Sequence, residues 1–126
     1  ADFIFNAINH YKAQVKKEYF TETEIKSVIT ECCNKVYPYF KDKGIKFPII
    51  KFRKMVSRWG SCHSKKGVVT FNTNLMYAPI DCIEYVVFHE FTHFLQANHS
   101  PLFYMELEKV CPHWKQLRKK LKNINF

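Results

Sequence analysis

The chain of 126 residues has the length of one domain, and its 47% hydrophobic and 17% aromatic residues exclude collagen-like, disordered and low-complexity proteins. No apolar run approaches the roughly 18 residues that a membrane span needs, so we expect a soluble globular domain with no membrane partner. The formal net charge of +9 is typical either of a protein that meets an anionic partner or of a surface with many solvated lysines.

The first section, residues 1–45, is expected to be helical. Apolar residues recur at helical spacing between residues 3 and 11, which predicts one helix. A second helix is predicted to begin after Thr21, because Thr21 and Glu24 form the pattern of a capping box. We expect Pro38 to kink or end that helix, since proline has no N–H to donate to the preceding turn.

The middle section, residues 46–75, is rich in strand formers. Residues 47–55 and 68–72 predict two strands, and the segment 57–67 between them is prone to form turns. We expect the two strands to pair antiparallel through an elaborate connection. Helices packed on a small antiparallel sheet then give the fold class, α+β.

The last section, residues 79–123, is again predicted to be helical. Pro79 opens an apolar run at helical spacing, Ser100 and Pro101 have the order of an N-cap and a first-turn proline, and Pro112 starts a short basic helix. No repeat or linker divides the chain, so we expect its 126 residues to form a single domain.

The pattern His-Glu-Phe-Thr-His at residues 89–93 lies in this last section. On a helix, His89 and His93 project from the same face and can bind one metal ion. Glu90 lies at the neighbouring edge, where its carboxylate can act as general base on a metal-bound water. Zinc held by neutral imidazoles lowers the pKa of that water to about 7, which predicts a metal-dependent hydrolase. Ni²⁺ or Co²⁺ can substitute for Zn²⁺ at such a site.

A catalytic zinc needs a third protein ligand, and His99 is the first candidate. We expect Asn98, a residue type that tolerates positive φ, to end the helix and turn the chain back toward the metal. A gluzincin-like arrangement, with Glu106 or Glu108 of the next helix as third ligand, is the alternative.

The segments Arg58–Cys62, Tyr85–His93 and Asn98–Ser100 resemble the YgjP-like (WSS-type) zinc metallopeptidase family and, more distantly, SprT-type protease domains. The match covers the chain from about residue 11 to residue 121. The resemblance implies a compact zincin-like metallopeptidase domain with an active-site helix, zinc on the three histidines named above, and Glu90 as general base. Family members usually carry an N-terminal β-rich region that this chain lacks.

Arg58 and His63 are candidate substrate-binding residues. Arg58 can stabilise a developing oxyanion or hold a carboxylate or phosphate, and His63 lies in the same connection. The alternative is that this segment only shapes the strand connection.

Three functional hypotheses follow, led by a zinc-dependent metallopeptidase that acts on a peptide or protein substrate. The second is a metal-dependent hydrolase of phosphoanhydrides or nucleotides, which the net charge and the basic residues Arg58, Lys65 and Lys66 favour. The third is a DNA-associated module, SprT-like or non-enzymatic, that docks on nucleic acid through the basic cluster at residues 115–120.

Five cysteines without a CxxC pattern argue against a disulfide scaffold and for a reducing, cytoplasmic location. We expect Cys62 and Cys82 to be unreactive thiols, and the protein to be a monomer. The first residue is Ala1, which favours a missing upstream region.

Overall fold

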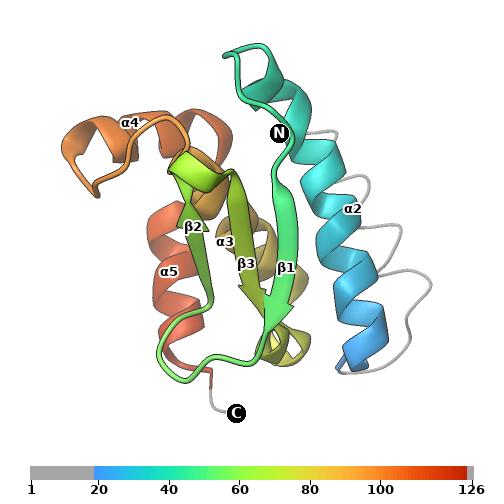
Figure 1. Cartoon of the computed structure of the whole chain (residues 1–126). Helices are drawn as coiled ribbons and strands as arrows, with labels where there is room; N and C mark the ends of the chain where they lie inside the picture. Colours follow the sequence, from blue (N-terminus) through green and yellow to red (C-terminus); the bar gives the residue numbers. More distant parts are fainter. Residues whose placement is uncertain (1–18, 125–126) are drawn as a thin grey trace.

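The computed structural model describes residues 19–124, and the helix expected between residues 3 and 11 lies outside that part (Figure 1). Within it, helices pack on a small sheet, in agreement with the expected α+β fold. In chain order the elements are α2 (Glu22–Lys41), β1 (Ile49–Arg53), β2 (Gly60–His63), the 3-10 helix η1 (Ser64–Lys66), β3 (Val68–Asn72), the 3-10 helix η2 (Thr73–Tyr77), α3 (Ile80–Thr92), α4 (Pro101–Val110) and α5 (Trp114–Lys122).

Helix α2 begins where the sequence predicted and continues past the proline. The backbone N of Glu24 donates to Thr21 Oγ1 at 3.1 Å, and the backbone N of Thr21 donates to Glu24 Oε1 at 2.8 Å, so the capping box is formed. Pro38 lies inside the last turn and does not end the helix. The carbonyl left without its donor belongs to exposed Asn34, while buried Phe40 holds the last turn against the core.

The sheet is mixed, with strand order β1-β3-β2. Strand β2 pairs antiparallel with β3, but β1 pairs parallel with it, with Phe52 opposite Phe71. The expected antiparallel pairing of segments 47–55 and 68–72 is therefore wrong. The connection between them contains a strand of its own, so the chain reverses direction twice before β3 begins.

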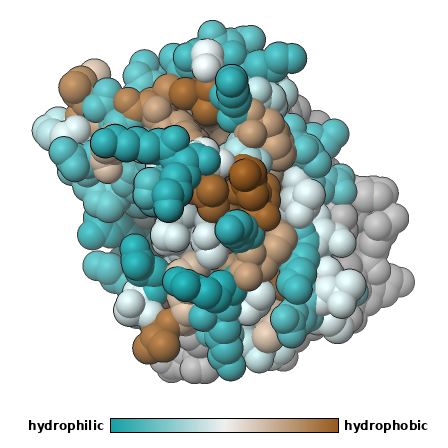
Figure 2. Space-filling model, in the orientation of Figure 1, coloured by the Kyte–Doolittle hydropathy of each residue, from teal (hydrophilic) through white to brown (hydrophobic). Residues whose placement is uncertain are grey.

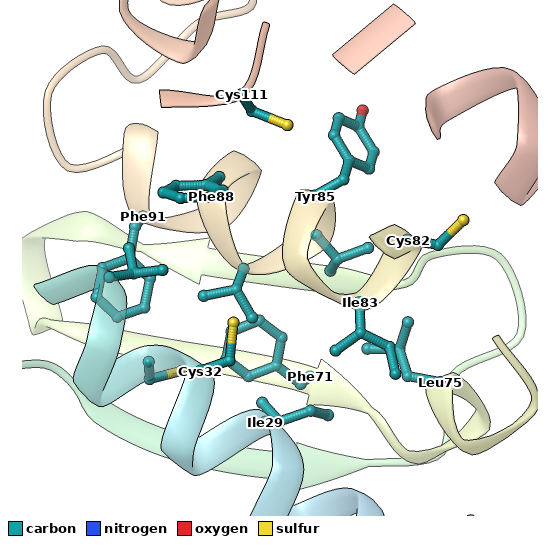
Figure 3. Packing of buried hydrophobic residues seen from close by; sticks show 14 of the residues in the cluster. Ile29, Cys32, Phe71, Leu75, Cys82, Ile83, Tyr85, Phe88, Phe91 and Cys111 are labelled. Atoms are coloured by element: carbon teal, nitrogen blue, oxygen red, sulfur yellow. The ribbon is translucent and has the colours of Figure 1, made fainter. Parts of the chain in front are cut away.

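Helix α3 is the centre of the core. Each of its residues except Asp81 and His89 is buried. Its apolar side chains meet Phe71 of β3 and Ile29 of α2, as Figure 3 shows. Because close packing surrounds it, helix α3 cannot shift or rotate without opening cavities, so the positions of its side chains are fixed.

The five cysteines are all free, and four of them are buried in or beside this core. Burial is the main cause that raises the pKa of each thiol, to about 12 for Cys62, Cys82 and Cys111. These cysteines thus behave as small apolar residues, as expected for Cys62 and Cys82.

The surface in the orientation of Figure 2 is largely hydrophilic, with a limited apolar area near its centre. Among residues 19–124, no helix combines the length and the apolar character that a transmembrane span requires.

Candidate metal centre

Three histidine side chains converge at one end of α3. His89 Nε2 lies 3.1 Å from His99 Nε2, and His93 Nε2 lies at the same distance from it. The three ligand atoms all lie within 4.8 Å of one another. The structure therefore brings together the three residues that the sequence singled out.

The chain returns to the helix through a tight turn directly after α3, which ends at Thr92. His93 is the C-cap residue, with φ −62° and ψ −19°. The backbone N–H groups of Leu95 and Gln96 then both donate to the Thr92 carbonyl, at 2.9 and 3.0 Å. No residue other than glycine has positive φ in the described part, so the role expected for Asn98 is wrong. Consecutive turns, and not one left-handed residue, bring His99 back.

Hydrogen bonds on the far ring atoms orient two of the imidazoles. His93 Nδ1 lies 3.2 Å from the Gln96 carbonyl and 3.1 Å from the Ala97 carbonyl. Because carbonyls only accept, Nδ1 carries the proton and Nε2 keeps its lone pair for a metal. His89 Nδ1 lies 3.3 Å from Tyr85 Oη, which provides a similar partner one helical turn away.

A single apolar ring supports the three imidazoles. The ring centroid of Phe103 lies 4.9 Å from that of His89, 4.7 Å from that of His93 and 5.0 Å from that of His99. Phe103 is fully buried on α4. Neither Phe103 nor Tyr85 was predicted as a site residue. Tyr85 lies four residues before His89 on α3, the spacing at which helical side chains meet, whereas Phe103 contacts the imidazoles through the packing of α4.

Electrostatics favour neutral imidazoles in this cluster. Burial, followed by the charges of His93 and His99, lowers the pKa of His89 to about 3. Burial and His99 also lower the pKa of His93. Neutral imidazole is the form that binds a metal, so these two side chains need not lose a proton at neutral pH.

The alternative third ligands lie elsewhere. Glu106 Oε1 accepts from Lys109 Nζ at 3.0 Å, and Glu106 Oε2 lies 3.9 Å from Lys43 Nζ. Glu108 is exposed, and within the described residues neither glutamate belongs to the cluster that can hold a metal. The geometry thus favours His99 over the gluzincin-like arrangement.

Glu90 is buried beside the cluster, at 6% exposure. Burial raises the pKa of its carboxyl to about 8, and the positive charge of Arg58 partly opposes that rise. A Cβ atom added to Gly60 would lie 2.9 Å from Glu90 Cγ. The glycine therefore permits β2 to pass directly against this carboxylate.

The histidines and Glu90 open into a cleft of about 430 Å³. The segment Arg58–Cys62, helix α3 with the turn that follows it, and Leu121 of α5 line this cleft. Arg58 is exposed there, as a substrate-binding residue would be. His63 does not line the cleft, because its Nδ1 accepts from the backbone N of Lys66 at 3.4 Å and caps η1.

A fully buried asparagine, Asn72, fixes the loop that carries Arg58. Asn72 Oδ1 accepts from the backbone N of Met55 at 3.2 Å and of Asn74 at 2.9 Å. Asn72 Nδ2 donates to the carbonyls of Met55 at 3.0 Å and Arg58 at 2.7 Å. The end of β3 thereby holds the loop at the mouth of the cleft.

Three converging imidazoles that leave one side open to a cleft fit a catalytic divalent cation. His89, His93 and His99 would hold it. Such a site, on an α+β domain and beside a buried glutamate, defines a metal-dependent hydrolase. Residues 5–124 match the family described as YgjP-like, metallopeptidase domain, and the chain therefore belongs to this metallopeptidase family. The resemblance seen in the sequence is confirmed.

The fold is shared with solved structures, two of which are metallopeptidase zymogens. The metallopeptidase zymogen of Pyrococcus abyssi abylysin aligns over 77% of this chain and 90% of its own, with TM-score 0.60 and 19% identity. The metallopeptidase zymogen of Methanocaldococcus jannaschii jannalysin aligns over 75% of this chain and 93% of its own, with TM-score 0.63 and 18% identity. No curated protein sequence matches the chain significantly. The expected compact zincin-like fold is confirmed.

Proposed function

We propose that this chain is a zinc-dependent metallopeptidase in which His89, His93 and His99 hold the cation and Glu90 is the general base. The observation that carries the proposal is the convergence of three imidazole Nε2 atoms within 4.8 Å beside a buried glutamate in an open cleft. All residues involved come from one chain, so we propose that a monomer suffices.

Each side chain has a distinct task in peptide hydrolysis. A zinc ion held by His89, His93 and His99 would supply Lewis-acid catalysis and would make water at the site acidic enough to lose a proton near neutral pH. Glu90 must be ionised to act as a base, and the positive charge of a cation at the histidines would favour that form against the effect of burial. Glu90 then takes a proton from the attacking water and delivers it to the nitrogen of the leaving amine. Arg58 carries a positive charge at the cleft and stabilises the negative charge that develops on the peptide oxygen.

Strand β2 provides a place for the substrate. It is an outer strand of the sheet, and Gly60, Ser61 and Cys62 line the cleft. An extended peptide that pairs with the free edge of β2 would lie beside Glu90 and the histidines. Cys62 is not a nucleophile here, because burial and the nearby Glu90 raise its pKa to about 12.

The test is the substitution Glu90→Gln. We expect the variant to keep one equivalent of zinc, measured by elemental analysis, while kcat/KM for peptide hydrolysis falls by at least about a hundredfold, because no base remains. Glu108→Gln, on the exposed face of α4, is the matched control and should leave both values unchanged.

Two outcomes would contradict the proposal. One is undiminished peptidase activity in the Glu90→Gln protein. The other is release of phosphate from a panel of nucleoside triphosphates with no cleavage of any peptide, which would favour the phosphoanhydride hydrolase instead. If elemental analysis found nickel or cobalt instead of zinc, the proposed identity of the metal would be wrong, but the roles proposed for the side chains would be unaffected.

A further inference from the structure

The charges of this chain are strongly segregated along the sequence. Residues 43–80 contain eight Lys or Arg and no Asp or Glu. Residues 109–126 contain six Lys or Arg and again no acidic residue. The first of these segments holds the whole sheet, and the second holds α5.

The two basic segments meet at the cleft. Strand β2 and helix α5 both pack against α3, the helix that carries His89 and Glu90. The first segment contributes Arg58–Cys62 to the cleft lining, and α5 contributes Leu121. Among the described residues that line the cleft, Glu90 alone is acidic.

Two arginines stand at the cleft. Arg58 is exposed and lines it directly. Arg118 lies on α5, one helical turn before Leu121, which also lines the cleft. Each of the two basic segments therefore brings a guanidinium group to this site or to its border.

Basic residues stand at both ends of β2. Arg58 lies in the loop two residues before the strand, and Lys65 and Lys66 lie in η1 directly after it. All three side chains are exposed, and within residues 19–124 they form no ion pair with a carboxylate. By contrast, Lys109 and Lys120 each have a carboxylate partner at 3.0 Å. The positive charge around β2 is thus not neutralised by the described part of the fold.

We propose that the cleft selects peptide segments that carry Asp or Glu on both sides of the bond to be cut. The proposal rests on the metallopeptidase function proposed above. An extended peptide advances about 3.3 Å per residue, so acidic side chains two or three residues from the scissile bond reach the basic groups at the two ends of β2. Complementary charge then raises the rate of encounter and disfavours basic segments.

A peptide fits this surface better than single-stranded nucleic acid does. Non-specific binding of single strands relies on aromatic side chains on which bases stack. Among the described residues, the exposed aromatic side chains, Tyr19, Phe47 and Tyr77, do not line the cleft. Two aromatic residues do line it: Tyr85 is 6% exposed and Trp59 is half-buried, so the cleft offers at most one partly exposed ring instead of a row of stacking platforms.

Three fluorogenic peptides with one common core, flanked by Glu, Gln or Lys, test the proposal. We expect the zinc-loaded protein to hydrolyse the Glu-flanked peptide with a kcat/KM about tenfold above that of the Gln-flanked one, and the Lys-flanked peptide most slowly. Fluorescence anisotropy with the Glu90→Gln protein, which should not cleave the peptides, should give the lowest Kd for the Glu-flanked peptide and the highest for the Lys-flanked one. Both differences should shrink in 0.5 M salt.

The double variant Lys65→Gln/Lys66→Gln should lower the preference about threefold. The double variant Lys35→Gln/Lys41→Gln removes two positive charges from α2, at positions that do not line the cleft, and should leave the preference for the Glu-flanked peptide unchanged. Equal hydrolysis and equal Kd values for the three peptides would overturn the proposal, as would a DNA 12-mer that binds more tightly than the Glu-flanked peptide and displaces it. Preferential binding of the Glu-flanked peptide without cleavage of any peptide would support the selectivity and overturn the peptidase function.

Discussion

One acidic side chain stands apart from the catalytic site. Glu84 of α3 is 3% exposed, and its Oε2 has no hydrogen-bond partner among the described residues. Burial raises the pKa of Glu84 to about 7, and the negative charge of Asp81 adds to that rise. A glutamate in such surroundings is neutral in mildly acidic solution and is forced to ionise inside the protein as the pH rises.

The substitution Glu84→Gln should therefore change the pH dependence of stability. The pKa in the folded state, about 7, lies above the ordinary value of 4.5, so the folded state holds its proton more firmly. The contribution of Glu84 is fully present below pH 4.5 and is lost as the pH rises through 7. We expect the free energy of unfolding of the parent protein, relative to Glu84→Gln, to fall by on the order of 2 to 3 kcal/mol between pH 4.5 and 8.

Urea unfolding of both proteins across that pH range measures the difference. Glu108→Gln controls for removal of an exposed carboxylate and should follow the parent protein. Parallel pH profiles for the parent and Glu84→Gln would show that Glu84 ionises as freely in the fold as in the unfolded chain.

The residues of the candidate metal centre were predictable from the sequence to different degrees, for physical reasons. His89, Glu90 and His93 lie within one helical turn, so their spacing alone places them on adjoining faces of α3. The contact of Phe103 with the imidazoles depends on the path of α4, and the contact of Gly60 with Glu90 depends on how β2 approaches α3. Such contacts between distant segments leave no local pattern in the sequence.

At the level of elements, helices with local signals were found and the sheet was partly missed. The capping box of α2 and the Ser100–Pro101 start of α4 depend only on residues that are close in the sequence, and both are present in the structure. Strand β2 reads Gly-Ser-Cys-His, which contains no strong strand former. It is a strand because β3 pairs with it, so its existence and the parallel direction of β1 follow from tertiary packing.

The substitution Asn72→Asp should release the loop between β1 and β2. It places a carboxylate oxygen against the carbonyls of Met55 and Arg58, where Nδ2 now donates. We expect a loss of about 2 to 4 kcal/mol in the free energy of unfolding, because buried acceptors would face each other. Zinc stoichiometry should persist, since the three histidines lie on α3 and its following turn, while KM rises as Arg58 loses its position.

Thermal unfolding, elemental analysis and kinetics together check this prediction. Asn34→Asp, at an exposed position of α2, makes the same chemical change outside the network and should have little effect. An Asn72→Asp protein with an unchanged Tm would show that these four hydrogen bonds do not hold the loop.

For the molecule as a whole, a cation at the histidines would join α3 to the turn that follows it, as far as His99. Binding to the folded state alone stabilises it by about 4 kcal/mol when the free ligand is a thousandfold above its Kd. We expect removal of the metal with a chelator to lower the Tm by about 10 °C, and zinc to restore it.

Calorimetry with and without chelator measures this effect. His99→Ala should abolish the rise of Tm with zinc, whereas His113→Ala, an exposed histidine at the N-cap of α5, should keep it. The same Tm with and without zinc in the parent protein would contradict a site that binds in the folded state.

The five free cysteines make the folded chain resistant to alkylation, whereas the unfolded chain is not. Alkylating reagents attack thiolates, and at neutral pH each of these sulfurs is held as a thiol by its surroundings. Once the core opens, all five sulfurs regain ordinary acidity together. The rate at which iodoacetamide modifies the protein therefore measures how often the core opens transiently, and no label needs to be introduced.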